Sequence, residues 1–200
     1  MKIGGLQKAS LIDYPGKTCA VIFTQGCNFR CVYCHNPELV YPGSFSDPIP
    51  FKYVHEFLKA KAGLLDGVVF SGGEPTIQSD IIEKIREVCS LGYAVKLDTN
   101  GSDPGVLASA LPYLDYVAMD IKAPMGDKYA RVCGVQVDYN DICKSIHLIK
   151  ASGIRHEFRT TFDKNLLEDA DIVKIRELAG RSKFSLQKMS KFRKIPVDSQ

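Results

Sequence analysis

The sequence predicts an α/β protein built as a partial, open (β/α)6 barrel. Two observations support this fold class: short apolar runs alternate with amphipathic stretches along most of the chain, and the connections between them are short. Such alternation is typical of a parallel sheet whose strands are joined by helical crossovers. Six strand–helix units are too few for an eight-stranded barrel, so we expect the sheet to stay open.

The predicted strands are short runs rich in β-branched and aromatic residues, with turn residues on either side. They cover residues 19–24, 67–71, 93–98, 116–122, 154–161 and 183–188. Amphipathic patterns predict helices over residues 51–63, 79–92, 103–112, 138–153 and 168–180. In the second of these, Ile81, Ile85 and Val88 share one face, and Gly92 follows as a C-terminal cap.

Length and composition favour one ordinary globular domain. We expect a single domain over residues 1–200, with residues 191–200 as a loose C-terminal tail. The net charge of +3 does not indicate a nucleic-acid partner. No stretch approaches the ~20 apolar residues of a membrane span, and the N-terminus lacks the apolar core of a signal peptide. The expected protein is therefore cytoplasmic and binds neither nucleic acid nor a membrane.

Polar motifs follow each of the first five predicted strands. They are a cysteine-rich stretch over residues 24–36, SGGEP (71–75), DTNG (98–101), MDIK (119–122) and RTT (159–161). In parallel α/β sheets the chemistry takes place at the carboxyl ends of the strands. We therefore expect these motifs to gather along one rim as a functional site.

The cysteine segment, residues 24–36, reads TQGCNFRCVYCHN and contains Cys27, Cys31 and Cys34 in the spacing C-x3-C-x2-C. This crowding is unusual for a chain with seven cysteines, so the spacing itself indicates a function. The other four cysteines are scattered, and we expect them to be small packing residues. They are Cys19, Cys89, Cys133 and Cys143.

Three kinds of site could use this segment. Zinc could take Cys27, Cys31, Cys34 and His35, but two adjacent ligands rarely reach one tetrahedral ion. CVYCH matches a haem-attachment pattern, which would require an exported protein and leave the first cysteine without a role. A [4Fe–4S] cluster on three cysteines leaves one iron without a protein thiolate, and that iron can bind a further ligand.

The pattern C-x3-C-x-aromatic-C, with Tyr33 before the last cysteine, resembles the signature of radical S-adenosylmethionine (SAM) enzymes. The resemblance implies a [4Fe–4S] cluster on the three cysteines and SAM chelated to the open iron through its amino and carboxylate groups. It also implies reductive cleavage of SAM to methionine and a 5′-deoxyadenosyl radical, with the protein supplying orientation and exclusion of solvent. The TIM-like partial barrel is the usual fold of that superfamily.

The other rim motifs resemble SAM-binding motifs of the same superfamily. SGGEP looks like the GGE motif that holds the SAM amino group, while LDTNG and MDIK resemble strand ends of glycyl-radical activating enzymes. By this resemblance Lys122 meets the SAM carboxylate and belongs with the three cysteines to the catalytic set. The implied cofactor-binding residues are Tyr33, Gly72, Gly73, Glu74, Asp98, Asn100, Lys122 and Arg159.

A monovalent cation, Na⁺ or K⁺, is a further implication of the resemblance. Its ligands would be Asp98, Thr99, Asp120 and the carbonyl of Ala118. Two neighbouring carboxylates repel each other when unpaired, so we expect either this cation or Lys122 between Asp98 and Asp120.

The N-terminal region narrows the resemblance. GLQKASLIDYPGKTCAVIFTQGCNFRCVYCHNPEL, residues 5–39, is similar to activating proteins of anaerobic ribonucleoside-triphosphate reductases. The implied partners are that glycyl radical enzyme and a flavodoxin or ferredoxin electron donor. Two alternatives stay open: a pyruvate formate-lyase-type activase and a small-molecule radical SAM enzyme such as a deazaguanine synthase. The absence of an insertion between Cys27 and Cys31 favours an activase.

Overall fold

Seven strands form one sheet in the order β1-β2-β3-β4-β5-β6-β7 in the computed structural model, which describes residues 1–188. The strands are β1 (Ile3–Ser10), β2 (Cys19–Thr24), β3 (Gly67–Gly72), β4 (Ala94–Thr99), β5 (Tyr116–Asp120), β6 (Arg155–Phe162) and β7 (Lys183–Lys188). Strands β2 to β7 pair in parallel, each with its successor along the chain. The first and last strands stand at opposite ends of this order, so the partial, open barrel is confirmed.

Strand β1 was not expected from the sequence. It pairs antiparallel with β2, from Ile3 opposite Thr24 to Ser10 opposite Cys19. Its sequence IGGLQKAS contains two glycines, three polar residues and only three apolar ones, and residues 7–9 are exposed, as is common in an edge strand. The prediction missed it because edge strands need little of the apolar alternation by which buried strands are recognised.

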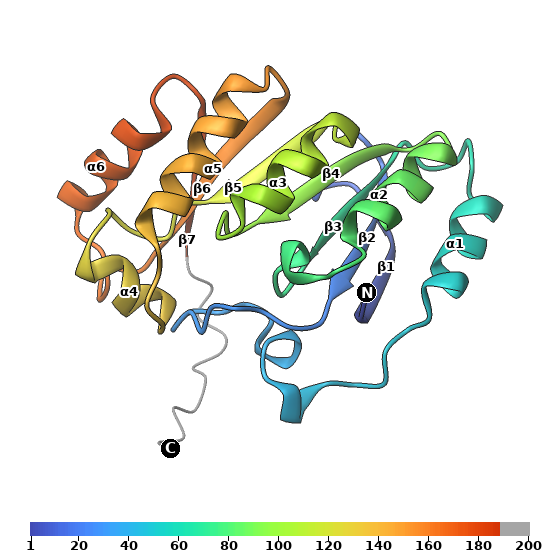
Figure 1. Ribbon diagram of the computed structural model, residues 1–200, viewed down its shortest axis with the longest axis horizontal. Helices are drawn as coiled ribbons and strands as arrows, with labels where there is room; N and C mark the ends of the chain where they lie inside the picture. Colours follow the sequence, from blue (N-terminus) through green and yellow to red (C-terminus); the bar gives the residue numbers. More distant parts are fainter. Residues whose placement is uncertain (189–200) are drawn as a thin grey trace.

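Helices cover one face of the sheet, from α1 at the right of Figure 1 to α6 at the left. They are α1 (Phe51–Ala60), α2 (Ile81–Ser90), α3 (Pro104–Ala110), α4 (Asp127–Cys133), α5 (Tyr139–Ala151) and α6 (Asp169–Ala179). Short 3-10 turns occupy Pro37–Leu39, Pro42–Ser44, Pro75–Ile77 and Leu111–Tyr113. All five predicted helices are present. Among the described residues α4 is the one additional helix. It begins after Gly126 with no capping side chain, whereas α3, of the same length, has the start signals Asp103 and Pro104.

The main core lies between the helices and the sheet, and it includes Ile22, Val68 and Val117 from three strands. Alternate strand residues point to the opposite face, where Val21 and Val69 belong to a second, smaller cluster. Within residues 1–188, no helix combines the length and the apolar character that crossing a membrane would demand. The expected tail, residues 191–200, lies outside the described residues.

Tyr14, from the loop after β1, fills the second cluster at the amino ends of the strands. Its ring lies 5.9 Å from that of Tyr116, at the start of β5. A Cβ on Gly67, the first residue of β3, would lie only 3.0 Å from the Tyr14 ring. Two tyrosine rings therefore pack together inside the sheet near the amino ends of β3 and β5.

Candidate functional site

A cavity of about 220 Å³ opens at the carboxyl ends of the strands. The three clustered cysteines and nearly all other predicted site residues line it, as expected from the strand order. Its lining includes Cys27, Cys31, Tyr33, Cys34, Gly72, Gly73, Glu74, Asp98, Thr99, Asn100, Asp120, Lys122 and Arg159. Ala118 does not line the cavity, since it lies fully buried in the second cluster, paired in register with Asp98.

The cysteine segment is held in place by backbone hydrogen bonds to distant parts of the chain. The amide of Gly26 donates to the carbonyl of Leu39 at 2.7 Å, and that of Arg30 donates to the carbonyl of Cys133, also at 2.7 Å. In Figure 1 this segment runs in light blue along the lower edge of the molecule, beside α4. These contacts fix the backbone on both sides of Cys27 and just before Cys31.

Cys27, Cys31 and Cys34 are free and partly buried. Burial raises the pKa of the Cys27 thiol to about 12, whereas the neighbouring Cys133 thiol lowers the pKa of Cys31 to about 7. Across residues 1–188, no three His, Cys, Asp or Glu side chains converge on a position for a single metal ion. The structure therefore does not assemble the zinc set that includes His35. In an iron–sulfur cluster each cysteine thiolate binds a different iron, so the three sulfurs do not have to meet at one point. Three thiols that line one cavity therefore fit a cluster.

Gly72 and Gly73 bring the end of β3 against the backbone that leads into Cys27. The amide of Gly73 donates to the carbonyl of Thr24 at 2.9 Å. A Cβ at Gly72, where φ is +113°, would lie 2.3 Å from the amide nitrogen of Thr24, and one at Gly73 would lie 1.9 Å from the carbonyl oxygen of Gly26. Neither approach leaves room for a side chain. The two glycines therefore bring the backbone at the end of β3 into close contact with the cysteine segment.

Glu74 is fully buried and accepts hydrogen bonds from its own turn and from the DTNG motif at the end of β4. Its Oε1 accepts from Thr76 Oγ1 at 2.7 Å and from Thr99 Oγ1 at 2.8 Å, and its Oε2 accepts from the amide of Asn100 at 2.7 Å. Burial raises the pKa of the Glu74 carboxyl, although these hydrogen bonds act in the opposite direction. The resemblance assigned the Glu74 carboxylate to the SAM amino group. In the structure this carboxylate joins the end of β4 to the turn after β3.

Asn100 connects the end of β4 to the cysteine segment. Its Nδ2 donates to Asn28 Oδ1 at 2.9 Å, and its Oδ1 accepts from the amide of Ser102 at 2.9 Å. Asn28 in turn donates to the Ser102 hydroxyl at 2.7 Å. Both side-chain polar groups of Asn100 therefore have protein partners.

Arg159, on β6, joins the two carboxylates of the expected cation site. Its Nε donates to Asp120 at 2.8 Å, and its terminal nitrogen lies 3.5 Å from Asp98. Lys122 donates to Asp120 at 2.8 Å, and Lys96 donates to Asp98 at 2.7 Å. Burial alone would raise the pKa of the Asp120 carboxyl, but Arg159 and Lys122 hold it well below its usual range.

The expectation that Lys122 stands between the two carboxylates is wrong, because Arg159 occupies that place and Lys122 contacts Asp120 alone. A monovalent cation at Asp98 and Asp120 stays a prediction. Such an ion would have to compete with three cationic side chains that already compensate the two negative charges.

The family model of the radical SAM superfamily matches residues 21–178. The chain belongs to the radical SAM superfamily. Enzymes of this superfamily use a [4Fe–4S] cluster and SAM, and the donor set of this cavity fits both groups. Three free thiols are available for three irons, and cationic and backbone groups lie across the same cavity for an amino acid such as the methionine part of SAM.

Two curated radical SAM relatives match most of the chain. The protein "Putative glycyl-radical enzyme activating enzyme MJ1227" of Methanocaldococcus jannaschii is 39% identical over 180 residues, covering 85% of this chain and 72% of that protein. The pyruvate formate-lyase-activating enzyme of Clostridium pasteurianum is 30% identical over 183 residues, covering 86% of this chain and 76% of that enzyme. The chain is thus an enzyme homologous to glycyl-radical enzyme activating enzymes.

Solved radical SAM structures share the fold at low sequence identity. Streptococcus suis SuiB bound to S-adenosylmethionine has a TM-score of 0.69 at 18% identity, and the match covers 88% of this chain and 42% of that chain. TYW1 with a lysine-pyruvate adduct has a TM-score of 0.64 at 20% identity, and the match covers 88% of this chain and 66% of that one. These likenesses concern the fold alone.

Two residues that shape this radical SAM site were not predicted from the sequence. Lys96 is almost fully buried and donates to the carbonyl of Asp13 as well as to Asp98, both at 2.7 Å. A single charge inside the apolar run YAVKL, residues 93–97, was the signal that could have identified it. Cys133 is the other residue, because its carbonyl accepts from the amide of Arg30, just before Cys31, at 2.7 Å. Spacing in the sequence gave no sign of this contact.

Proposed function

We propose that this chain is a glycyl-radical activase whose target is an anaerobic ribonucleoside-triphosphate reductase. The observation that carries the proposal is the grouping of three free cysteines and the polar ends of β3 to β6 around one cavity. The curated relatives support an activase, and the similarity of residues 5–39 to reductase activators supports the target. In this proposal residues 1–200 make a single radical SAM domain.

In the proposed site, Cys27, Cys31 and Cys34 hold three irons and leave the fourth for SAM. When bound, the cluster would supply one electron and SAM the sulfonium bond that this electron cleaves, with methionine released, so that together they would supply hydrogen-atom abstraction. Lys122, oriented by its ion pair with Asp120, binds the SAM carboxylate. The backbone of Gly72 and Gly73 lies beside the SAM amino group. Residues such as Tyr33, Asn100 and Arg159 complete the cofactor-binding side of the cavity.

Access for a protein substrate is supported by the open sheet. A backbone glycine can reach the cavity only as an extended loop, and among the described residues β1 and β7 do not pair with each other. The cavity lining extends to Thr161 on β6 and Gln187 on β7, toward this open edge. Phe29 and Val40, both buried, form apolar parts of the lining and exclude water. We therefore expect the target loop to enter along the β7 side.

The remaining partner is an electron donor, and flavodoxin or ferredoxin is the proposed one. All seven cysteines are free, which suits the reducing cytoplasm where such donors act. The binding of this donor and the cytoplasmic location belong to the proposal.

Electron paramagnetic resonance under anaerobic conditions tests the proposed target. The protein is mixed with SAM, a reductant and an anaerobic ribonucleoside-triphosphate reductase, and a parallel sample contains pyruvate formate-lyase. We expect a glycyl radical signal with the reductase that depends on SAM. A signal with pyruvate formate-lyase alone would support the first alternative. Efficient turnover of a free small molecule, with no radical on either protein, would contradict an activase.

A further inference from the structure

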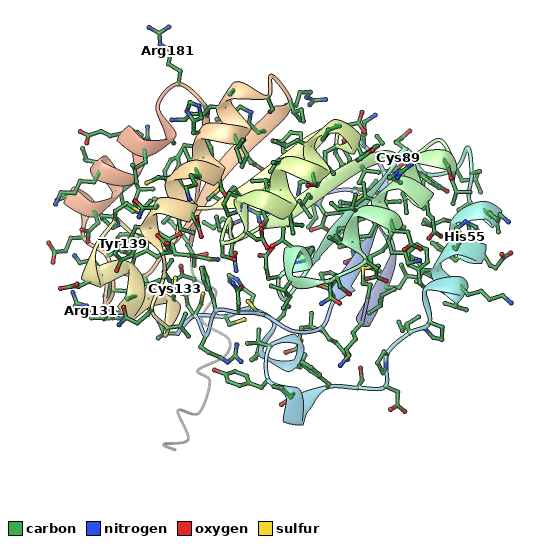
Figure 2. The ribbon with its side chains drawn as sticks, in the orientation of Figure 1. His55, Cys89, Arg131, Cys133, Tyr139 and Arg181 are labelled. Atoms are coloured by element: carbon green, nitrogen blue, oxygen red, sulfur yellow. The ribbon has the colours of Figure 1, made fainter. Side chains whose placement is uncertain are left out.

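Strand β7 is the last strand of the sheet, and within residues 1–188 no strand pairs with its outer side. On its inner side it pairs in parallel with β6, from Glu157 opposite Lys183 to Phe162 opposite Lys188. An edge strand presents a row of backbone N–H and C=O groups with which a further extended segment can pair. Figure 2 shows Arg181, in the turn before β7, extended away from the molecule, so this side chain does not cover the edge.

The side chains of β7 alternate between two hollows on opposite faces of the sheet. Ser185 and Gln187 line a cavity of about 260 Å³, and Gln187 also lines the candidate site. Leu186, which stands between them, is 45% exposed and lines a groove on the helix side together with Val173 of α6. Successive residues of a strand point to opposite faces. A strand added beside β7 would therefore direct its own side chains alternately toward these two hollows.

The groove on the helix side offers apolar surface to such a strand. Its lining includes Phe162, Ile172, Val173 and Leu186, and Val173 is 58% exposed. Covering this surface with apolar side chains is favourable by about 25 cal/mol per Å² of area buried. The residues of the added strand that face the helices should therefore be apolar.

The opposite face of the added strand meets the candidate site, where a glycine fits. Thr161 of β6 and Gln187 of β7 line that cavity on neighbouring strands. A residue beside Gln187 on the same face would direct its side chain toward the cavity. A glycine has only hydrogens on its Cα, so it presents a Cα–H bond and leaves the space free. That bond is the one from which an activase takes a hydrogen atom.

We propose that the glycine-containing segment of the protein substrate adds to the open edge of β7 as an eighth strand. Its glycine faces the candidate site, and the residue on each side of the glycine faces the groove of Leu186 and Val173. The inference rests on the proposed function, because it takes a backbone glycine as the substrate. In strand addition, backbone hydrogen bonds provide affinity and pockets for alternate side chains provide specificity. The substrate class is thus an extended segment with apolar residues on both sides of the glycine.

The test uses the fluorescently labelled peptide Glu-Thr-Val-Thr-Val-Gly-Val-Thr-Val-Thr-Glu. When it is extended, its valines lie on one face and its glycine and threonines on the other. The terminal glutamates complement the exposed Lys183 and Lys188 at the two ends of β7. Binding to the full chain is measured by fluorescence anisotropy, both without a cluster and after reconstitution with cluster and SAM. This readout does not depend on radical chemistry.

Two N-methylated forms of the peptide test the backbone hydrogen bonds. One form carries N-methyl groups on the two valines beside the glycine, and the other carries them on the glycine and on the threonine two positions later. Successive N–H groups of a strand point to opposite sides, so only one of these sets can donate to β7. We expect one form to bind about tenfold or more weakly and the other to bind like the parent peptide. Equal affinity of the two forms, or an equal loss in both, would overturn strand addition.

Leu186→Ser and Val173→Ser test the groove, and both side chains are exposed enough for the variants to fold. Each should bind the parent peptide about three- to tenfold more weakly. Leu64→Ser is the matched control, because Leu64 is 69% exposed and lines none of the three hollows, and its affinity should not change. Unchanged affinity in both groove variants would contradict the placement. A wild-type dimer in sedimentation that Leu186→Ser dissociates would assign the edge to a second copy of the chain instead.

The two proposals fail in different ways. A glycyl radical on the reductase that forms equally well in Leu186→Ser and Val173→Ser, with no peptide binding, would keep the activase and overturn strand addition. Peptide binding with the expected difference between the N-methylated forms, but no radical on any target protein, would show a strand site without an activase and overturn the assignment of its substrate. Weaker radical formation in both groove variants, at full iron content, is the result expected.

Discussion

The side chains around the cavity mostly bind one another, and this changes the roles that sequence motifs alone suggest. Glu74 receives its hydrogen bonds from Thr76, Thr99 and Asn100, so it organises the strand ends. Arg159 similarly bridges Asp98 and Asp120. A motif identifies which residues gather at a site, but their individual partners depend on tertiary geometry. Charge-assisted bonds of this kind also hold the groups that remain free for a ligand in fixed positions.

Asp120→Asn should destabilise the protein, because it leaves Lys122 without its carboxylate and Arg159 with only the 3.5 Å contact to Asp98. Removing one partner of a buried ion pair costs about 3 kcal/mol. The expected change is a free energy of unfolding lower by about that amount at neutral pH, measured by urea denaturation.

The pH dependence of this effect has a defined sign. The pKa of Asp120 is lower in the folded protein than its ordinary value of 3.8, so its stabilising contribution is present above that pH and is lost as the pH falls below it. The stability difference between wild type and Asp120→Asn should therefore shrink in acid. A difference that stays constant from neutral pH down to the acid range would contradict the ion-pair assignment.

Two elements of the fold, the turn after β3 and the cysteine segment, depend on each other for their shape. The contact is backbone against backbone, with the amide of Glu74 donating to the carbonyl of Gly26 at 2.9 Å. This explains why glycine is required there before any ligand is considered. α4 plays a similar part from the other side, through Cys133 and Arg30.

Gly73→Ala should displace the cysteine segment, because the new Cβ would lie 1.9 Å from the carbonyl oxygen of Gly26. We expect reconstituted protein to lose most of its iron, and the free energy of unfolding to fall by about 2 kcal/mol or more. Gly43→Ala is the matched control, since no atom lies within 4 Å of a Cβ built there. Equal iron content in the two variants would show that this contact does not shape the cluster site.

The parallel order of the strands across the whole molecule explains why so much of the site could be predicted from the sequence. Parallel strands end on one edge, so motifs placed after consecutive strands had to meet there once the strands and their order were recognised. The cavity accordingly collects Cys27, Glu74 and Lys122 from distant parts of the chain. Tyr14 and Tyr116 pack together near the other end of the strands.

What the sequence did not predict depends on contacts rather than on local pattern. Edge strand β1 contains glycines and exposed positions, so it has no clear period, and the short α4 begins after Gly126 without a capping side chain. The pairing of Arg159 with Asp98 joins β6 to β4 across β5, and that of Cys133 with Arg30 joins α4 to the cysteine segment. Such pairs require the packed structure, because no spacing rule links positions that far apart.

The cysteines provide the most direct test of the central claim, that three of them bind a [4Fe–4S] cluster with one iron left for SAM. The measurement is iron content and the electron paramagnetic resonance spectrum of the reduced protein, with and without SAM, after anaerobic reconstitution. The set is the wild type, the Cys→Ala variants at Cys27, Cys31 and Cys34, and Cys19→Ala and Cys89→Ala as controls away from the cavity.

We predict that each of the three cavity variants loses the cluster or holds a defective one, while both controls keep iron and activity. The controls should lose only some stability, of the size of a small core truncation. SAM should change the spectrum of the wild type and of the controls. A wild-type spectrum that does not change when SAM is added would contradict the account. So would a loss of the cluster in Cys19→Ala or Cys89→Ala as complete as that in Cys27→Ala.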